Sequence, residues 1–256
     1  MTAPLSSIKK ALHVLSAFSI ETPELGVTEI GNLLKSHKSS ISRILLTLMS
    51  EGFVEKNPVT GKYRLGLKLV DLGNRVLGRF DLRDLAGPFM EELAKNTREI
   101  IHLSVLDKNE IVYLDKRGEE QTLTVATRIG GRNPAHASAM GKVLLSGLPP
   151  EDLSSVLAIA PLTRFTENTI TTTSGLLKEL KKVRKQGFAV DNEEAFLGIR
   201  CVAAPITDSQ GKIIAAISCT VPTQRMAPER MKEMQKHVTH TARQISERLR
   251  ITGRGV

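Results

Sequence analysis

The order of elements predicted between Val27 and Leu65 constrains this chain more than any other feature. Apolar residues recur every three or four positions in two short segments, which predicts two helices that each bury one face. These residues are Val27, Ile30, Leu33 and Leu34 in the first helix and Ile41, Ile44, Leu45 and Leu48 in the second. We expect Ser36 to cap the second helix. A turn at residues 57–61 joins two alternating segments that predict a β-hairpin, and this order of elements is typical of a winged helix-turn-helix.

The charge of this stretch favours DNA as its partner. The cations between residues 35 and 68 are Lys35, Lys38, Arg43, Lys56, Lys62, Arg64 and Lys68, against the carboxylates Glu51 and Glu55. In a recognition helix, short hydroxyl side chains allow close approach to phosphates, and a long donor reaches the base edges. The expected DNA-binding residues are Lys38, Ser39, Ser40, Ser42, Arg43 and Thr47 on the second helix and Lys62 and Arg64 on the hairpin. The alternative is a pair of helices whose polar face is simply solvated.

Composition sets the class of protein. The chain has 256 residues, 41% of them hydrophobic and 25% charged, which is enough for two ordinary globular domains. Its net charge of +9 is compatible with a polyanionic partner. No segment approaches the ~18 consecutive apolar residues of a membrane span, and the N-terminus lacks a signal-peptide pattern, so we expect a cytoplasmic protein with no membrane partner. Cys201 and Cys219 show neither a disulfide framework nor a zinc spacing, so no metal and no other cofactor is expected.

Three segments are expected along the chain: a winged helix-turn-helix domain over residues 1–66, a linker helix over 67–80 and a second domain over 81–256. The DNA-binding bundle gains a third helix at residues 6–19, whose expected buried side carries Ile8, Ala11, Leu12, Leu15 and Phe18. One stripe of the linker helix carries Leu69, Leu72 and Val76. Two interpretations of this stripe remain open: a symmetric contact with the same helix of a second subunit, or packing on the chain's own second domain.

The pattern after residue 81 changes to mixed helices and strands. Helices are predicted at residues 82–97, 134–148, 150–158, 174–186 and 228–250, and strands at 101–105, 111–113, 123–127, 188–190, 198–207 and 212–221. An antiparallel sheet with segregated helices indicates an α+β domain.

The last two predicted strands place several small polar residues together. A tight turn at Asp208–Gly211 would pair Cys201 with Ser218. Thr220 would then share their face of the sheet. Cys219 would point to the opposite face, which argues against a disulfide with Cys201.

Two passages carry more specific motifs. One is Gly130–Lys142, with the sequence GGRNPAHASAMGK, and the other runs from Lys185 to Ser218 and includes KQGFAVDNEE and GIRCVAAPI. Together with the N-terminal winged helix-turn-helix, they resemble the IclR family of bacterial transcriptional regulators over essentially the whole chain. The resemblance implies a GAF-like effector-binding domain, a homodimer or homotetramer on double-stranded operator DNA, and a small-molecule effector, mostly an organic acid or an aromatic from a catabolic pathway. It leaves open whether the protein represses or activates.

The resemblance also implies which residues contact the effector, namely Ala139, Met140, Asp191, Cys201, Ser218 and Thr220. Met140 is bulkier than the small residue often found at its position, so we expect a narrower pocket. A helix start near residues 134–138 would add free backbone N–H groups for a carboxylate. The alternative is that Cys201 and Ser218 are only small core residues.

The sequence also contains residues that suggest other functions. His136, Cys201 and Asp191 suggest a catalytic triad, but Cys201 lies in an apolar strand without a glycine elbow, which argues against a nucleophile. His237 and His240 share a basic helix with no carboxylate at matching spacing, which argues against a metal site. An architectural DNA-binding protein would not need a large second domain.

Overall fold

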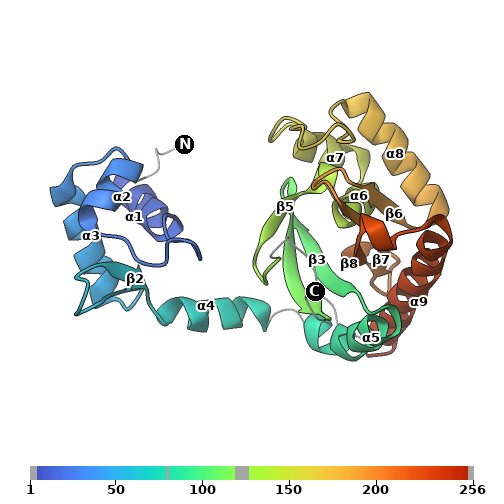
Figure 1. The fold of residues 1–256 in the computed structure, drawn as a ribbon, viewed down its shortest axis with the longest axis horizontal. Helices are drawn as coiled ribbons and strands as arrows, with labels where there is room; N and C mark the ends of the chain where they lie inside the picture. Colours follow the sequence, from blue (N-terminus) through green and yellow to red (C-terminus); the bar gives the residue numbers. More distant parts are fainter. Residues whose placement is uncertain (1–4, 79–80, 119–126, 253–256) are drawn as a thin grey trace. The chain divides into compact units, whose positions relative to one another are not determined.

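A computed structural model describes residues 5–78, 81–118 and 127–252 of the chain (Figure 1). The chain divides into two units, Met1–Arg79 and Phe80–Val256. The first contains a two-stranded sheet and the second a six-stranded sheet. The strand predicted at residues 123–127 lies outside the described residues, except for Thr127.

The first unit has the predicted order of helix, turn, helix and hairpin. Its elements are α1 (Ser6–Ser16), α2 (Val27–Leu33), α3 (Lys38–Ser50), β1 (Val54–Lys56), β2 (Tyr63–Leu65) and α4 (Lys68–Leu77). The core between the helices and the hairpin consists of Val14, Phe18, Leu25, Ile30, Ile41, Leu45, Val54 and Tyr63. A Cβ atom at Gly66 would lie 2.2 Å from the Gly52 carbonyl oxygen. The chain therefore needs glycine where it leaves the hairpin in close contact with the backbone after α3. The winged helix-turn-helix prediction is confirmed.

Two details predicted for this unit are wrong. His37 occupies the N-cap position of α3, and Ser36 instead donates through its hydroxyl to a carbonyl at the end of α2. In α1, Ile8 and Leu12 are 55% and 58% exposed, whereas Val14 is fully buried. Val14 lies at one edge of a wide apolar face, so the spacing alone does not select which part of that face packs against α3.

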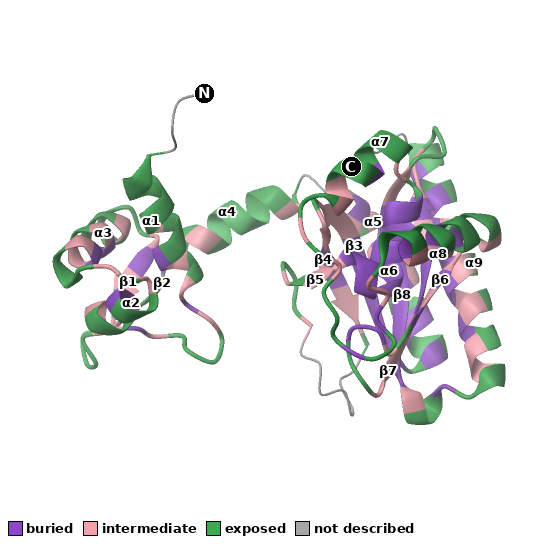
Figure 2. Cartoon of the chain, turned by 90° about the horizontal axis from the view of Figure 1, so that it is seen from above, coloured by how far each residue is buried: buried purple, intermediate pink, exposed green. Residues whose placement is uncertain are grey.

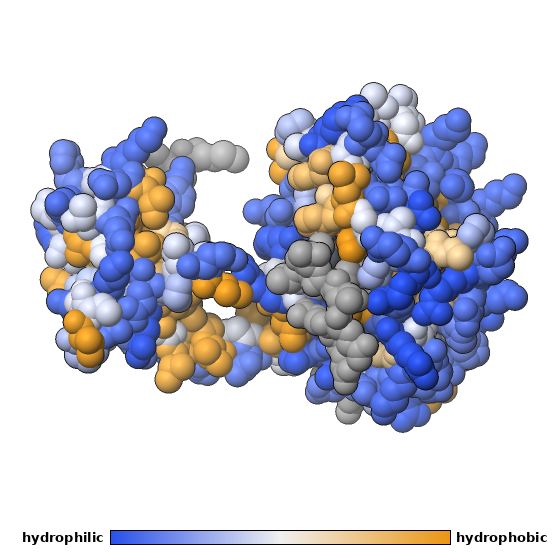
Figure 3. All heavy atoms as spheres, viewed as in Figure 1, coloured by the Kyte–Doolittle hydropathy of each residue, from blue (hydrophilic) through white to orange (hydrophobic). Residues whose placement is uncertain are grey.

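Helix α4 buries none of its side chains. Leu72 is 37% exposed and Val76 54% exposed. The helix is exposed along nearly its whole length (Figure 2), and apolar side chains gather at the surface around it (Figure 3). A helix of this kind keeps an apolar stripe available for a partner.

A six-stranded antiparallel sheet forms the centre of the second unit. Its strands are β3 (Ile100–Asp107), β4 (Glu110–Arg117), β5 (Arg132–Pro134), β6 (Ala189–Asn192), β7 (Ile199–Thr207) and β8 (Ile213–Pro222), in the spatial order β5-β4-β3-β8-β7-β6. The helices are α5 (Asp81–Thr97), α6 (Ala139–Ser146), α7 (Pro150–Leu157), α8 (Thr173–Gln186) and α9 (Pro228–Thr252). Helices α6 and α8 pack on one face of the sheet and α5 and α9 on the other (Figure 1). The α+β class is confirmed.

The segment predicted as one helix over residues 134–148 is divided differently. Its start belongs to edge strand β5, and α6 begins only after Ser138, whose Oγ accepts a hydrogen bond from the Gly141 N–H at 3.1 Å. A Cβ atom at Gly141 would lie 2.1 Å from the Ala135 carbonyl oxygen. The chain therefore needs glycine where α6 folds back over the preceding turn.

The register of the β7–β8 hairpin differs by two residues from the prediction. Cys201 pairs with Thr220, and Ser218 pairs with Ala203. The turn is longer than predicted because the Asp208 carboxylate accepts hydrogen bonds from two backbone N–H groups within it, and a bulge follows Ile206. The sequence does not reveal either feature.

The predicted sheet faces are nevertheless correct, because a shift of two residues preserves them. Ser218 and Thr220 share the α6 side of the sheet with Cys201. Cys219 lies on the α9 side, where its sulfur is 3.7 Å from Met234 Sδ. Both cysteines are free.

Candidate functional site

A cavity lies between α6 and the sheet of the second unit. All the residues expected to contact the effector line it, namely Ala139, Met140, Asp191, Cys201, Ser218 and Thr220. The cavity measures about 40 Å³, which is room for roughly three water molecules. Residues of α6, β6, β7 and β8 thus line one small cavity.

Further lining residues were missed by the sequence reasoning: Ile100, His102, Tyr113, Thr127, Asn133, Ser138, Phe196 and Ile199. His102 pairs with Ser218, and Ile100 with Thr220, across β3 and β8. The alternation along β3 places these two side chains on one face. This alternation does not reveal that β3 pairs with a strand more than a hundred residues away. The sequence alone therefore did not indicate that His102 and Ile100 line the cavity.

A chain of hydrogen bonds between neutral groups crosses the cavity wall. The Cys201 thiol donates to Thr220 Oγ1 at 3.4 Å, Thr220 Oγ1 lies 3.2 Å from His102 Nδ1, and His102 Nε2 lies 2.6 Å from Thr127 Oγ1. Thr220 Oγ1 thus connects the thiol to one ring nitrogen of His102, and Thr127 Oγ1 meets the other. Burial, and secondarily the charge of Lys116, lower the pKa of His102 to about 3, so the ring is neutral.

Two more hydroxyl groups belong to this wall. The Tyr113 ring lies 5.0 Å from the His102 ring, centroid to centroid, and its hydroxyl pairs with Asn133. Burial raises the pKa of Tyr113, so the phenol keeps its proton. The buried Ser218 Oγ has no hydrogen-bond partner among the described residues. A ligand in the cavity would supply the partner that such a buried group ordinarily has.

Asp191 supplies the carboxyl group of the cavity wall. It is 4% exposed, it pairs with Cys201 across β6 and β7, and its Oδ1 accepts from the Glu194 N–H at 2.7 Å. Burial raises the pKa of Asp191 to about 7, and the Glu194 carboxylate acts in the same direction. Burial, with a contribution from Asp191, also raises the pKa of the Cys201 thiol, which opposes nucleophilic chemistry there.

The N-terminus of α6 adjoins the cavity. Its first two N–H groups, those of Ala139 and Met140, have no acceptor in the described part of the chain. They lie one turn later than the free N–H groups expected near residues 134–138, and they favour an anion. The Met140 sulfur accepts from Ser104 Oγ at 3.1 Å, which holds this bulky side chain in the cavity wall. No lysine or arginine of the described chain lines the cavity.

The structure does not assemble the catalytic triad that was weighed. His136 Nε2 pairs with the Thr163 carbonyl oxygen at 3.0 Å and is not part of the cavity lining. The described residues contain no group of three or more potential metal ligands. One expectation is wrong in detail, because His237 does have a carboxylate neighbour, Glu233, at 3.6 Å on the preceding turn of α9.

On the first unit, α3 presents the polar face expected of a recognition helix. Lys38, Ser39, Arg43 and Thr47 are exposed, and Ser40 and Ser42 are partly buried. Thr47 Oγ1 donates to the Arg43 carbonyl oxygen at 3.1 Å, so part of its hydrogen-bonding capacity is used within the helix. The Arg43 side chain forms no ion pair within the described ranges. It is therefore available to a ligand such as DNA.

The two wing cations are paired within the unit. Lys62 Nζ lies 2.9 Å from Glu29 Oε1, and Arg64 Nη2 lies 3.1 Å from Glu55 Oε2. Glu29 also accepts from the Gly26 N–H at 2.6 Å, so it connects the start of α2 to the wing. These pairs are exposed and hence weak, and phosphate can replace either carboxylate. The positive charge counted from the sequence therefore overstates the charge that the wing presents.

Comparison with known proteins identifies the family. The model of the IclR helix-turn-helix domain matches residues 7–58, and that of the bacterial transcriptional regulator IclR C-terminal domain matches residues 74–247. The chain belongs to the IclR family. It is 39% identical to the HTH-type transcriptional regulator KdgR of Escherichia coli, over 96% of this chain and 93% of the relative. It is 35% identical to the regulator XynR of the same organism, over 96% and 97% of the two chains.

Solved structures of IclR proteins share the fold. The Thermotoga maritima IclR superimposes with a TM-score of 0.78 at 34% identity, over 95% of this chain and 98% of the other. An IclR homologue from Microbacterium hydrocarbonoxydans, solved in complex with 4-hydroxybenzoate, gives 0.83 at 27% identity, over 95% and 99%. This IclR-family chain is thus a transcriptional regulator with a helix-turn-helix domain and an effector-binding C-terminal domain. Its relatives are named regulators, and nothing among them indicates catalysis. Every helix described here is too short or too polar to cross a bilayer.

Proposed function

We propose that this IclR-family regulator controls a catabolic operon in the cytoplasm, binding operator DNA through α3 and the wing and binding a small organic acid in the cavity under α6. The observation that carries the effector half is the character of the cavity wall. Among the described residues, neutral donors line the cavity, the Ser218 hydroxyl and two N–H groups of α6 have no partner, and no cation belongs to the lining. The DNA half rests on the exposed hydroxyls of α3 and on Arg43.

The lining of the cavity favours a ligand with a single carboxylate. A polyanion such as a nucleotide phosphate would lose its hydration without meeting a cation, which is unfavourable in a buried site. One carboxylate can be satisfied by the amides of Ala139 and Met140 and the hydroxyl of Ser218. A ligand hydroxyl or keto group then fits the polar atoms of His102.

The size of the cavity favours a small hydroxy or keto acid over an aromatic one. A space of about 40 Å³ holds only a few non-hydrogen atoms unless the wall moves. Met140 could enlarge the cavity by giving up its hydrogen bond from Ser104, because an unbranched thioether adapts its rotamer easily. Neutral hydrogen bonds of ~1 kcal/mol each also imply micromolar or weaker affinity.

The apolar stripe on α4 supports a homodimer, or a homotetramer made of two such dimers. Leu72 and Val76 are exposed in the single chain, although an apolar stripe is normally covered. A second copy of α4 is a natural cover, because a symmetric contact places the same apolar surface on both sides.

The experiment that tests this function is titration calorimetry of the full chain. The panel comprises pyruvate, glyoxylate, lactate, 4-hydroxybenzoate and adenosine monophosphate. We expect at least one small acid to bind, to bind more tightly than the nucleotide, and to change affinity for an operator selected from a random duplex library. Preferential nucleotide binding, or operator affinity that no acid alters, would contradict the proposal.

A further inference from the structure

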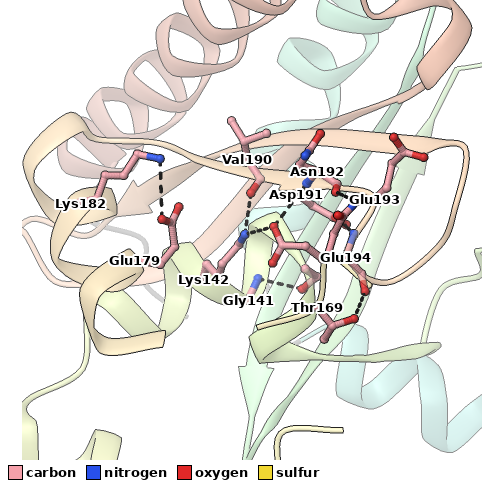
Figure 4. A network of polar contacts seen from close by, with 12 residues as sticks. Gly141, Lys142, Thr169, Glu179, Lys182, Val190, Asp191, Asn192, Glu193 and Glu194 are labelled. Carbon is pink, nitrogen blue, oxygen red and sulfur yellow. Dashed lines mark hydrogen bonds and ion pairs between the residues drawn. The ribbon is translucent and has the colours of Figure 1, made fainter. Parts of the chain in front are cut away.

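Lys142 is a fully buried lysine beside the segment that carries the cavity residue Asp191. It lies on α6, two residues after Met140, and its side chain is 1% exposed. Its ammonium donates to Glu194 Oε1 at 2.5 Å and to the Val190 carbonyl oxygen at 2.6 Å (Figure 4). A buried ion pair is weak support for stability by itself, because desolvation offsets the attraction between the charges. Its position next to the cavity therefore calls for a further explanation.

Glu194 connects this lysine to Asp191. Its backbone N–H donates to Asp191 Oδ1 at 2.7 Å, and its carbonyl oxygen accepts from Thr169 Oγ1 at 2.7 Å (Figure 4). Its own Oε1 meets Lys142, whereas its Oε2 has no hydrogen-bond partner in the described chain. Glu194 thus fixes the segment that carries the Asp191 carboxyl through three contacts, to Asp191, Thr169 and Lys142.

The charges of this cluster do not balance when both carboxyl groups are ionised. One ammonium faces two carboxylates, and it pairs directly with Glu194. The remaining negative charge would lie on Asp191, which is 4% exposed. An isolated buried carboxylate normally takes up a proton instead of staying charged.

Within the described residues, no other element supplies a compensating charge at Asp191, whose carboxyl group also meets the backbone N–H groups of Glu194 and Ala195. The Cys201 thiol of β7 and the Tyr113 phenol of β4 lie near it, and the His102 ring of β3 lines the same cavity. All three are neutral, because burial raises the pKa of the thiol and of the phenol and lowers that of the imidazole. The hydroxyls of β8 carry no charge. Glu193 is turned away and pairs with Arg200 at 3.5 Å.

We propose that Lys142 and Glu194 are positioning residues that assign the proton of this cluster to Asp191, so that a carboxylate ligand enters the cavity together with one proton. The ligand half rests on the proposed function. A protonated Asp191 donates a hydrogen bond to the ligand carboxylate, whereas an ionised Asp191 repels it. Ligand affinity then falls as the pH rises through the pKa of Asp191, approaching tenfold per pH unit above it.

The first test needs no ligand, so its failure is distinguishable from failure of the proposed function. Carbon-13 NMR of the full chain, labelled at aspartate and glutamate carboxyls, follows both groups between about pH 4 and 9. Asp191→Asn and Glu194→Gln assign the two resonances. We expect the Asp191 carboxyl to titrate near neutral pH. Titration of Asp191 near 3.8, the ordinary value for an aspartate, would overturn the proposal.

A pair of variants separates a positioning role from a merely structural one. In Glu194→Gln, Lys142 keeps its charge and Asp191 becomes the nearest carboxylate, so we expect the Asp191 midpoint to fall by two pH units or more, as for an aspartate beside a cation. In the double variant Lys142→Met with Glu194→Gln, both charges are gone and the midpoint should return to near neutral. Equal midpoints in the wild type and in Glu194→Gln would refute the assignment. If Glu194→Gln does not fold, the wild-type titration still decides.

The ligand half is tested with pyruvate and its uncharged counterpart pyruvamide. Pyruvate at high concentration is expected to raise the Asp191 midpoint, because a ligand that prefers the protonated form raises its pKa. Pyruvamide should leave the midpoint nearly unchanged. A midpoint that pyruvate does not move, or that pyruvamide moves equally, would overturn the carboxylate-plus-proton model.

Discussion

The Cys201 thiol lies 3.4 Å from the hydroxyl of Thr220, its cross-strand partner, and the same hydroxyl is 3.2 Å from His102 Nδ1. One hydroxyl group therefore joins three strands of the sheet at the cavity wall. It accepts from the thiol and pairs with the imidazole, so it connects the side chains of Cys201 and His102. The behaviour of the site should be sensitive to this atom.

Thr220→Val removes the hydroxyl but keeps the shape of the side chain. His102 Nδ1 would then be a buried polar atom without its hydrogen-bond partner, so we expect the free energy of unfolding to fall by ~1–3 kcal/mol. Thr220→Ser keeps the hydroxyl and is the matched control, with a smaller loss expected. Urea denaturation of both variants measures the difference. Equal losses would show that the hydrogen-bond chain contributes nothing.

Ser218→Ala should separate ligand binding from stability. The hydroxyl is buried without a partner among the described residues, so removing it should leave the ligand-free protein as stable as before or slightly more so. Effector affinity should fall by ~1 kcal/mol, because the ligand loses a donor. Affinity of the ligand-free protein for the operator should not change. Calorimetry and DNA binding measure these effects, with Ser154→Ala on the exposed side of α7 as the control. Full retention of the effector response in Ser218→Ala would contradict this account.

Arg43→Ala should weaken binding to the operator by ~1–3 kcal/mol and relax discrimination between sequences, provided that the guanidinium reads a base.

Lys62→Ala should instead lower the affinity for all DNA sequences similarly and make this affinity less dependent on salt concentration. Since Lys62 pairs with Glu29, Glu29→Gln should release the ammonium and raise the affinity for all duplexes. Fluorescence anisotropy at several salt concentrations tests the three variants. Unchanged operator affinity in Arg43→Ala would move the recognition surface elsewhere.

Leu72→Glu combined with Val76→Glu should weaken self-association. Both side chains are exposed on one stripe of α4, and two carboxylates placed in a symmetric apolar contact would be buried without partners. Sedimentation velocity measures the change, and Asn74→Glu on the opposite side of α4 is the control. An unchanged oligomer would place the interface outside α4, for example on the second unit.

The pH dependence of stability should show two opposing contributions. The raised pKa of Asp191, about 7 instead of 3.8, stabilises the fold at low pH, and this contribution is lost as the pH rises. The lowered pKa of His102, about 3 instead of 6.5, stabilises the fold at high pH, and this contribution is lost as the pH falls. Between about pH 4.5 and 6, folding takes up one proton at Asp191 and releases one at His102, so the two slopes cancel.

Single variants should reveal each slope. In Asp191→Asn, the free energy of unfolding should rise with pH relative to the wild type by up to ~1.4 kcal/mol per unit in this range. In His102→Gln it should fall with pH by a similar amount. Chemical denaturation at several pH values measures both, and every other titrating group is common to the three proteins. Parallel pH profiles would show that neither group is perturbed in the fold.

Much of the architecture follows from local features of the sequence. Helical spacing at Ile41 and Leu45, and alternation along the wing, sufficed to predict a winged helix-turn-helix. The two motif passages indicated the family and the cavity residues. Where local spacing was ambiguous, it failed: Val14 packs inward in place of Ile8, and His37 takes the N-cap in place of Ser36.

The sequence by itself determined most of the elements, their order and the face of the sheet on which Cys201, Ser218 and Thr220 lie, because periodicity is a property of neighbours along the chain. Only the tertiary structure decided which strands meet. The long Asp208 turn moved Cys201 opposite Thr220, and the pairing of β3 with β8 brought His102 into the cavity. Likewise, the sequence around Lys142 does not predict its ion pair with Glu194. The burial that makes such charges pair arises only when distant segments pack together.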